Sequence, residues 1–126
     1  MPDIKDLDAL GARERQIMAA LFRLGRAGVA EVREQLESPP TYSAVRGMLG
    51  LLEQKGFVTH ARDGLRYVYA STFSPLKAKR RALQDVVTTF FRGSPERAVS
   101  ALLGLNEDTA IDLDKLRAII ERSSKT

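Results

Sequence analysis

The sequence contains no cysteine and only one histidine, His60. Without cysteine there is no disulfide, thiolate metal site or cysteine nucleophile, and one histidine cannot form a histidine-rich metal cluster. We therefore expect neither an enzyme nor a bound metal or other cofactor. The chain also lacks an apolar run approaching the roughly 20 residues of a membrane-spanning helix. Its polar start, MPDIKDLD, is not typical of a signal peptide. We expect a cytoplasmic protein that does not insert into a membrane.

A large excess of positive charge is missing from most of the chain. The 126 residues carry a net charge of +4, with an isoelectric point near 9.7. Residues 1–74 contain ten Lys or Arg against nine Asp or Glu, and residues 75–126 contain ten against seven. Overall basicity is therefore weak evidence for a nucleic-acid partner, which has to be argued from where the basic side chains lie.

Apolar residues at helical spacing predict two short helices in the first 40 residues. The first covers residues 11–24 and stops at Gly25. The second covers about residues 30–37 and is ended by Ser38-Pro39-Pro40, because proline cannot continue a helix. A brief extended piece is expected between them, near Gly28 and Val29.

Residues 41–56 predict a third helix with two different faces. The inward face carries apolar residues at positions i, i+3, i+4 and i+7, namely Val45, Met48, Leu49 and Leu52. The outward face carries Ser43, Arg46, Gly47, Gly50 and Gln54. A glycine inside a helix costs about 1 kcal/mol relative to alanine, so two on an exposed face indicate the close approach of another molecule. Thr41 or Ser43 can cap the start of this helix.

The helical spacing of the apolar residues ends at Gly56. Residues 57–62 and 65–70 are rich in aromatic and β-branched residues and predict two strands, separated by the hairpin signal Asp63-Gly64. The order of three helices and a hairpin predicts a winged helix-turn-helix domain over residues 1–73. In such a domain the third helix enters the major groove of DNA, and the hairpin, or wing, lies along the phosphates.

This arrangement predicts two sets of DNA contacts. Arginine pairs with the O6 and N7 atoms of guanine, and small or hydroxyl side chains allow close approach to base edges. The residues expected at base edges are Ser43, Arg46, Gly47 and Gly50, and those expected at the DNA backbone are Thr41, Tyr42, Gln54, Arg62 and Arg66.

Residues 74–126 predict a second, helical domain. Ser74-Pro75 begins a helix, Gly93-Ser94-Pro95 separates it from another over about residues 95–105, and a last helix covers about residues 112–123. Three such helices can barely form a core alone, so we expect them to pair with a second copy. The residues expected in dimerisation are Leu76, Leu83, Val87, Phe90, Phe91, Val99, Leu102, Leu103, Leu116 and Ile120. Whether Lys77, Lys79, Arg80 and Arg81 touch DNA is left open.

The order of elements and several short strings together resemble the penicillinase-repressor (BlaI/MecI) family of winged-helix regulators. The matching strings are Arg15-Gln16-Ile17-Met18, Leu24-Gly25, residues 29–32, Tyr42-Ser43-Ala44-Val45, Leu52-Glu53-Gln54-Lys55-Gly56, Tyr67-Val68-Tyr69 and Phe90-Phe91-Arg92-Gly93-Ser94. The resemblance implies a mainly α-helical homodimer that binds a palindromic operator and represses transcription. In antibiotic-responsive members a membrane-bound metalloprotease sensor cuts the repressor in its dimerisation region, here around residues 98–103.

The sequence departs from the family pattern in the third helix and at the C-terminus. Leu51 stands where many relatives carry arginine, and Gly47 and Gly50 replace bulkier polar residues, so a different operator is expected. The copper-responsive branch uses C-terminal cysteines, which are lacking here. A second hypothesis is a winged-helix protein-interaction module that does not bind DNA, and the nearly balanced charge of residues 1–74 is compatible with it.

Overall fold

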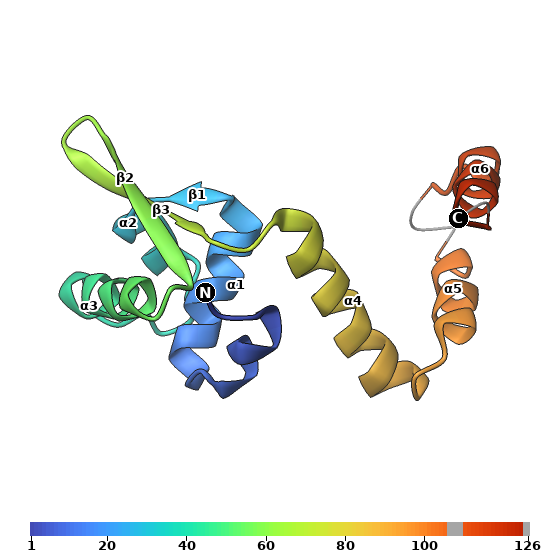
Figure 1. Cartoon of the computed structure of the whole chain (residues 1–126), viewed down its shortest axis with the longest axis horizontal. Helices are drawn as coiled ribbons and strands as arrows, with labels where there is room; N and C mark the ends of the chain where they lie inside the picture. The colour runs from blue at the N-terminus through green and yellow to red at the C-terminus, as the bar shows by residue number, and fades with distance from the viewer. Residues whose placement is uncertain (106–109, 125–126) are drawn as a thin grey trace. The chain divides into compact units, whose positions relative to one another are not determined.

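The computed structural model describes residues 1–105 and 110–124 (Figure 1). The elements, in chain order, are the 3-10 helix η1 (Ile4–Ala9), then α1 (Ala12–Leu24), β1 (Arg26–Ala27), α2 (Val29–Glu34), α3 (Tyr42–Gln54), β2 (Val58–Asp63), β3 (Arg66–Ser71), α4 (Pro75–Phe91), α5 (Pro95–Leu103) and α6 (Leu113–Ser124). This confirms the expected fold class, mainly helical with a small β-hairpin. Across residues 1–105 and 110–124, no helix has both the length and the apolar character needed to cross a bilayer.

The chain divides into two compact units, Met1–Arg81 and Ala82–Thr126. The boundary falls inside α4, so the first turns of this helix belong to the N-terminal unit. Two ion pairs hold them there. The ammonium group of Lys77 lies 3.9 Å from Asp3, and the guanidinium group of Arg81 pairs with Asp8.

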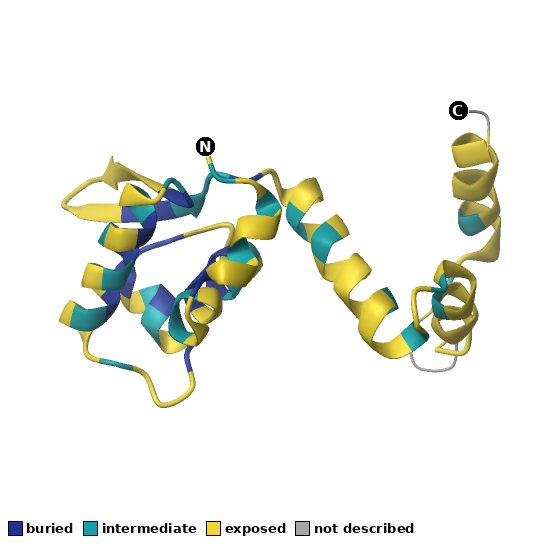
Figure 2. Ribbon diagram, turned by 60° about the horizontal axis from the view of Figure 1, so that its bottom comes forward, coloured by how far each residue is buried: buried dark blue, intermediate teal, exposed yellow. Residues whose placement is uncertain are grey.

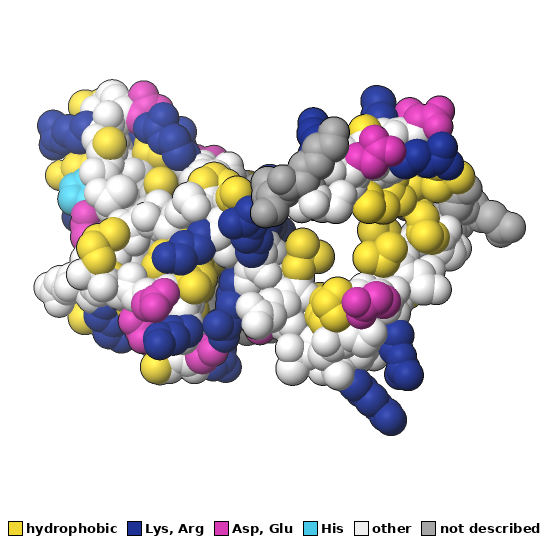
Figure 3. Space-filling model, turned by 45° about the vertical axis from the view of Figure 1, so that its right-hand side comes forward, with side chains coloured by type: hydrophobic (Ala, Val, Ile, Leu, Met, Phe, Trp, Pro, Cys, Tyr) yellow, Lys and Arg dark blue, Asp and Glu magenta, His cyan; other side chains and the backbone are white. Residues whose placement is uncertain are grey.

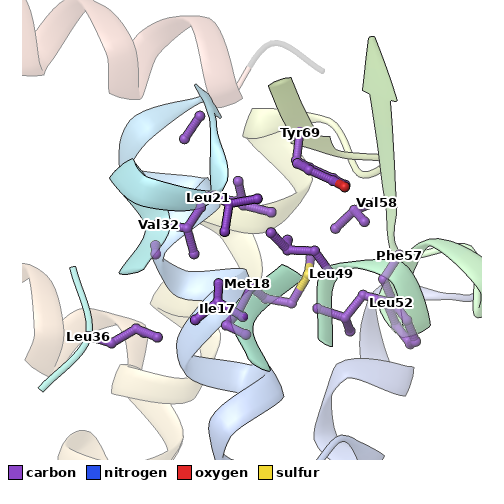
Figure 4. Close-up of a cluster of buried hydrophobic side chains, with 14 of the residues drawn as sticks. Ile17, Met18, Leu21, Val32, Leu36, Leu49, Leu52, Phe57, Val58 and Tyr69 are labelled. Atoms are coloured by element: carbon purple, nitrogen blue, oxygen red, sulfur yellow. The ribbon is translucent and has the colours of Figure 1, made fainter. Parts of the chain in front are cut away.

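The core of the N-terminal unit lies where α1, α2 and α3 meet the sheet (Figure 4). Ile17 of α1 and Val32 of α2 have no accessible surface, and neither do Val45, Leu49 and Leu52 of α3. Fully burying an aliphatic side chain contributes about 1.5–3 kcal/mol, so these residues fix the orientation of α3. The predicted inward face of the third helix is therefore confirmed, with Met48 partly buried beside it.

The sheet has three antiparallel strands in the order β1-β3-β2. The hairpin of β2 and β3 was predicted, whereas the pairing of β1 with β3 was not. The extended piece expected near Gly28 and Val29 lies two residues earlier, at Arg26–Ala27. It starts there because Gly25, with φ of 79°, ends α1 and turns the chain at once.

The turn of the hairpin is also displaced by one residue. Asp63 lies opposite Arg66, so the two-residue loop is Gly64-Leu65 and not Asp63-Gly64. Gly64 occupies the first loop position with φ of 67°, which suits a glycine-first hairpin turn. Both strands consequently begin one residue later than expected.

The second helix is shorter than the sequence predicted. It ends at Glu34 instead of residue 37, before the prolines are reached. The next residues form a turn whose carbonyl groups are bonded by arginines: Arg13 donates to Glu37 and Ser38 at 3.1 and 3.3 Å, and Arg33 donates to Pro40 at 2.6 Å. These bonds, two of which come from Arg13 on another helix and cannot be read from helical spacing, replace the last helical turn.

The C-terminal helices begin where the capping residues indicated. Ser74 and Ser94 accept hydrogen bonds from the N–H groups of Lys77 and Arg97. The helix α5 ends at Leu103, two residues earlier than expected, and α6 starts and ends one residue later than expected.

The C-terminal unit has no buried residue among those that the structure describes, residues 82–105 and 110–124 (Figure 2). Its most covered apolar side chains, such as Val87, Phe91 and Leu116, are only half-buried. Figure 3 shows apolar side chains at the surface of this unit. Three amphipathic helices thus leave their apolar faces accessible within one chain.

Candidate nucleic-acid interface

The outward face of α3 is open to solvent. Ser43, Arg46 and Gly47 are exposed, and Tyr42 and Leu51 each keep 53% of their surface accessible. Gly50 is half-buried and Gln54, on the last turn, is exposed. The burial of the opposite face fixes this surface as the one that α3 presents to other molecules.

Neither glycine of α3 is required by packing within the chain. A Cβ added at Gly47 or Gly50 would meet no atom within 4 Å. Each glycine nevertheless costs the helix about 1 kcal/mol relative to alanine. The folded chain therefore offers no internal reason for these two residues, and Gly47 is itself exposed.

Thr41 is the N-cap of α3, which resolves the choice between Thr41 and Ser43. Its Oγ1 accepts a hydrogen bond from the N–H of Ala44 at 3.1 Å. Ser43 therefore lies on the exposed first turn without a capping role. If Thr41 also contacts a DNA phosphate, it has to use the same hydroxyl group that caps α3.

A groove of about 270 Å³ lies between the start of α3, the start of α2 and the hairpin. Its lining includes Arg46 and Tyr42 from α3, Arg66 and Tyr69 from β3, and Gly28 before α2. Arg46 makes no hydrogen bond or ion pair with the residues that the structure describes. Burial is the main cause that raises the pKa of Tyr69, and the charge of Arg46 opposes it. The phenol therefore stays neutral beside a guanidinium group that is open to an anionic partner.

The wing is attached to the end of α3 through His60. Its Nδ1 lies 2.7 Å from both carboxylate oxygens of Glu53, and its ring packs edge-on against Tyr67 with centroids 4.8 Å apart. The guanidinium carbon of Arg62 lies 5.6 Å from the centroid of the same Tyr67 ring. His60 is thus an exposed strand residue that also joins two parts of the predicted interface.

Arg66 is paired within the chain. Its Nη1 lies 2.5 Å from Glu31 Oε1, and its Nη2 lies 3.8 Å from Asp63. Since Arg62 faces Tyr67 and Arg66 faces Asp63 across the hairpin, the alternation of strand side chains puts the two arginines on opposite faces. The sequence placed both at the wing, and the pairing register separates them.

The basic cluster at the start of α4 is partly neutralised. Lys77 and Arg81 pair with acidic residues of the N-terminal segment, as described above, whereas Lys79 and Arg80 are exposed. The acidic start of the chain therefore offsets part of the positive charge of this cluster.

The structure brings Arg46, Tyr42 and Arg66 to one groove, and it leaves Gln54 at the other end of α3. Sequence reasoning missed two residues beside them. Leu65 lies fully exposed at the tip of the wing. Glu31 accepts the N–H of Gly28 at 3.2 Å, and its position three residues after a helix-starting glycine was the signal that could have revealed this cap.

The three helices and the antiparallel hairpin define a winged-helix domain. The family model described as "penicillinase repressor" matches residues 10–122. The chain belongs to this family, which consists of transcriptional regulators and is not a family of enzymes. The resemblance inferred from the sequence is therefore confirmed.

Solved structures with similar folds support the architecture. The structure titled as the complex structure of hsRosR-S1 shares 19% identity, with a TM-score of 0.62, covering 82% of this chain and 95% of that one. Rv0081 of Mycobacterium tuberculosis shares 20% identity at a TM-score of 0.52, covering 82% and 99%. YusO of Bacillus subtilis shares 20% identity at a TM-score of 0.50, covering 85% and 80%. A search of curated proteins found no match.

Proposed function

We propose that the protein is a sequence-specific DNA-binding repressor that acts as a homodimer on a palindromic operator. The observation that carries this proposal is the outward face of α3, where an unpaired arginine lies beside two glycines that the fold does not need. A face of this kind allows the helix backbone to come close to base edges while one long donor reads them. Family membership agrees with it.

In the proposed complex, the first half of α3 carries base recognition. Arg46 donates to guanine O6 and N7, Ser43 bonds a neighbouring base or phosphate, and Gly47 and Gly50 allow the close approach. The backbone contacts come from Thr41, Tyr42 and Gln54 of the α3 region and from Arg62 of the wing. Arg66 reaches a phosphate only where its ion pair with Glu31 opens. Because Leu51 offers no hydrogen bond on the second half of the outward face, base specificity is concentrated near the start of the helix.

The homodimer is proposed because of the open apolar faces of the C-terminal helices. Leu83, Phe90 and Ile120 remain 64%, 74% and 57% exposed within one chain. Full burial of such a side chain is worth about 1.5–3 kcal/mol, and a second copy of the same helices can recover the part that the exposed surface still forgoes. A two-fold dimer then presents its two copies of α3 to two half-sites. These half-sites are separated by about 34 Å for each helical turn of DNA between them.

Family membership also makes a membrane-bound metalloprotease sensor a proposed partner. Its cut, around residues 98–103, would fall within α5. The neighbouring genes provide the test: a gene for a membrane metalloprotease beside this one supports the partnership, and its absence argues for another signal.

The function is tested by a mobility-shift titration of the full chain on the DNA upstream of its own gene and on random-sequence duplex. Arg46→Ala should cost about 1–3 kcal/mol on the cognate fragment and relax the preference at one position per half-site. Arg117→Ala removes the same charge from the C-terminal unit and serves as the control. Equal losses of affinity on the cognate fragment and on the random-sequence duplex would mean that Arg46 contacts a phosphate and not a base. No shift at low salt would favour the protein-interaction module.

A further inference from the structure

Glu31 holds the arginine at the tip of the wing. Its Oε1 lies 2.5 Å from Arg66 Nη1 and also accepts the N–H of Gly28 at 3.2 Å. The Gly28 N–H first, and the Arg66 side chain second, lower the pKa of this carboxyl, so Glu31 is ionised at neutral pH. Because the cap fixes the carboxylate at the start of α2, it forms a stationary anion beside the DNA-facing groove.

A carboxylate and a phosphate compete for the same donors of an arginine. The guanidinium group presents its N–H groups as a planar fork that matches either anion. In Arg66, Nη1 is directed to Glu31 and Nη2 lies 3.8 Å from Asp63. A DNA phosphate can take the Nη1 donor only by displacing Glu31, and it also meets the negative charge that Glu31 leaves behind.

We propose that Glu31 is a specificity-determining residue, which acts by withholding Arg66 from DNA phosphates and so keeps sequence-independent binding weak. This inference rests on the proposed DNA-binding function, since it assigns a role to an acidic residue at the same interface. The contact between Glu31 and Arg66 is exposed enough to open, with side-chain accessibilities of 43% and 57%. Phosphate contacts carry no sequence information, so an arginine held back from them lowers binding to all DNA and leaves base reading to α3.

The experiment compares Glu31→Gln with Glu34→Gln in the full chain. Glutamine retains an oxygen that can accept the Gly28 N–H, so the start of α2 is preserved. Glu34 is exposed on the same short helix, and its substitution removes the same charge. Unfolding curves establish that both variants fold. Affinities are then measured on random-sequence duplex over a range of salt concentrations.

Glu31→Gln should bind random duplex about two- to fivefold more tightly than the wild type, the range expected when one exposed ion pair is removed. The slope of log affinity against log salt should steepen by about 0.9, because one more phosphate contact forms. Glu34→Gln should leave the slope unchanged, and Arg66→Ala added to Glu31→Gln should abolish the gain.

Three results would overturn the proposal, and they can be told apart. A loss of affinity in Glu31→Gln would mean that Glu31 orients Arg66 toward DNA. A gain equal to that of Glu34→Gln, with unchanged slope, would mean that only net charge matters. If the wild-type chain and both variants fail to bind any duplex at low salt, the proposed function itself is wrong and this inference falls with it.

Discussion

The imidazole Nδ1 of His60 lies 2.7 Å from both carboxylate oxygens of Glu53, which joins β2 of the wing to the last turn of α3. A carboxylate only accepts, so the hydrogen on Nδ1 is donated to Glu53. The wing and α3 are therefore linked by a polar contact in addition to the apolar core beneath them. A change in this contact should alter how the wing is presented to DNA.

The substitution Glu53→Gln should loosen the wing with little effect on the rest of the domain. It replaces a charge-assisted hydrogen bond by a weaker neutral one, at a cost of about 0.2–1 kcal/mol for an exposed pair. Amide hydrogen exchange should accelerate in β2 and β3 but not in α1. Glu34→Gln, which has the same chemistry on α2, provides the control. Unchanged exchange in the hairpin would show that the core alone fixes the wing.

Gly47→Ala and Gly50→Ala should separate stability from DNA binding. Since a Cβ at either position meets nothing within 4 Å, each variant should gain up to about 1 kcal/mol in the free energy of unfolding. The added methyl groups lie on the face proposed to approach base edges, so affinity for the cognate fragment should fall. Thermal unfolding and mobility-shift titration measure the two effects.

A matched control for these variants is Gly25→Ala. This glycine also has open space around a new Cβ, but its φ of 79° is unfavourable for alanine, so the variant should lose stability. If Gly47→Ala and Gly50→Ala gain stability and bind DNA as tightly as the wild type, the proposal that DNA closely approaches α3 is wrong.

Much of the fold could be predicted because its signals are local. The apolar spacing of Val45, Leu49 and Leu52 gave the orientation of α3, and serine and proline at the start of α4 gave its first residue. The shorter α2 and the third strand depend on contacts between distant residues, such as the bond from Arg13 to the Glu37 carbonyl. Neither periodicity nor turn residues contain that information.

The candidate site was predictable only in part for the same reason. The spacing of residues along one helix was enough to place Arg46, Gly47 and Gly50 on its outward face. The ion pair between Arg66 and Glu31 joins residues 35 positions apart, so the sequence presented Arg66 as a simple basic residue at the wing. The roles proposed for these residues at DNA remain predictions.

Gly56→Ala should destabilise the N-terminal unit for two reasons. Gly56 has φ of 89°, where an L-residue costs about 1–2 kcal/mol, and a new Cβ would lie 2.8 Å from Cδ of Pro2. Gly25→Ala pays only the first cost, so it should be the milder variant in urea unfolding. In a chain that also carries Pro2→Gly, Gly56→Ala and Gly25→Ala should lose the same free energy of unfolding. A difference that persists would mean that the chain start does not pack on Gly56.

Glu14→Gln should reveal how one ion pair makes stability depend on pH. The hydrogen bond from Lys55, at 2.9 Å, is the main cause that lowers the pKa of Glu14 from its ordinary value of 4.5. A carboxyl with a lowered pKa stabilises the fold above its unfolded-state pKa, and this stability is lost as the pH falls through the folded-state value. The variant should therefore be less stable by about 0.2–1 kcal/mol at pH 7.

The difference between wild type and Glu14→Gln should shrink below pH 4.5 and vanish once Glu14 is protonated in both states. Glutamine can still accept the Gly11 N–H that Glu14 bonds at 3.2 Å, so the start of α1 is retained. Urea unfolding at a series of pH values measures the effect. A difference that is constant down to pH 2 would assign the loss to packing instead of charge.

Phe90→Glu should separate the two chains of the proposed homodimer without unfolding the winged-helix unit. Phe90 lies on α4 with 74% of its surface accessible, and it belongs to a unit in which no described residue is buried. If a second copy covers this ring, an added charge must be buried or the contact must open, and the dimer should dissociate. Sedimentation equilibrium measures the mass, with Leu24→Glu, an exposed leucine of α1, as the control. Wild-type chains that sediment as monomers would refute the dimer. A Phe90→Glu variant that remains dimeric would mean that the dimer interface lies on another face of these helices.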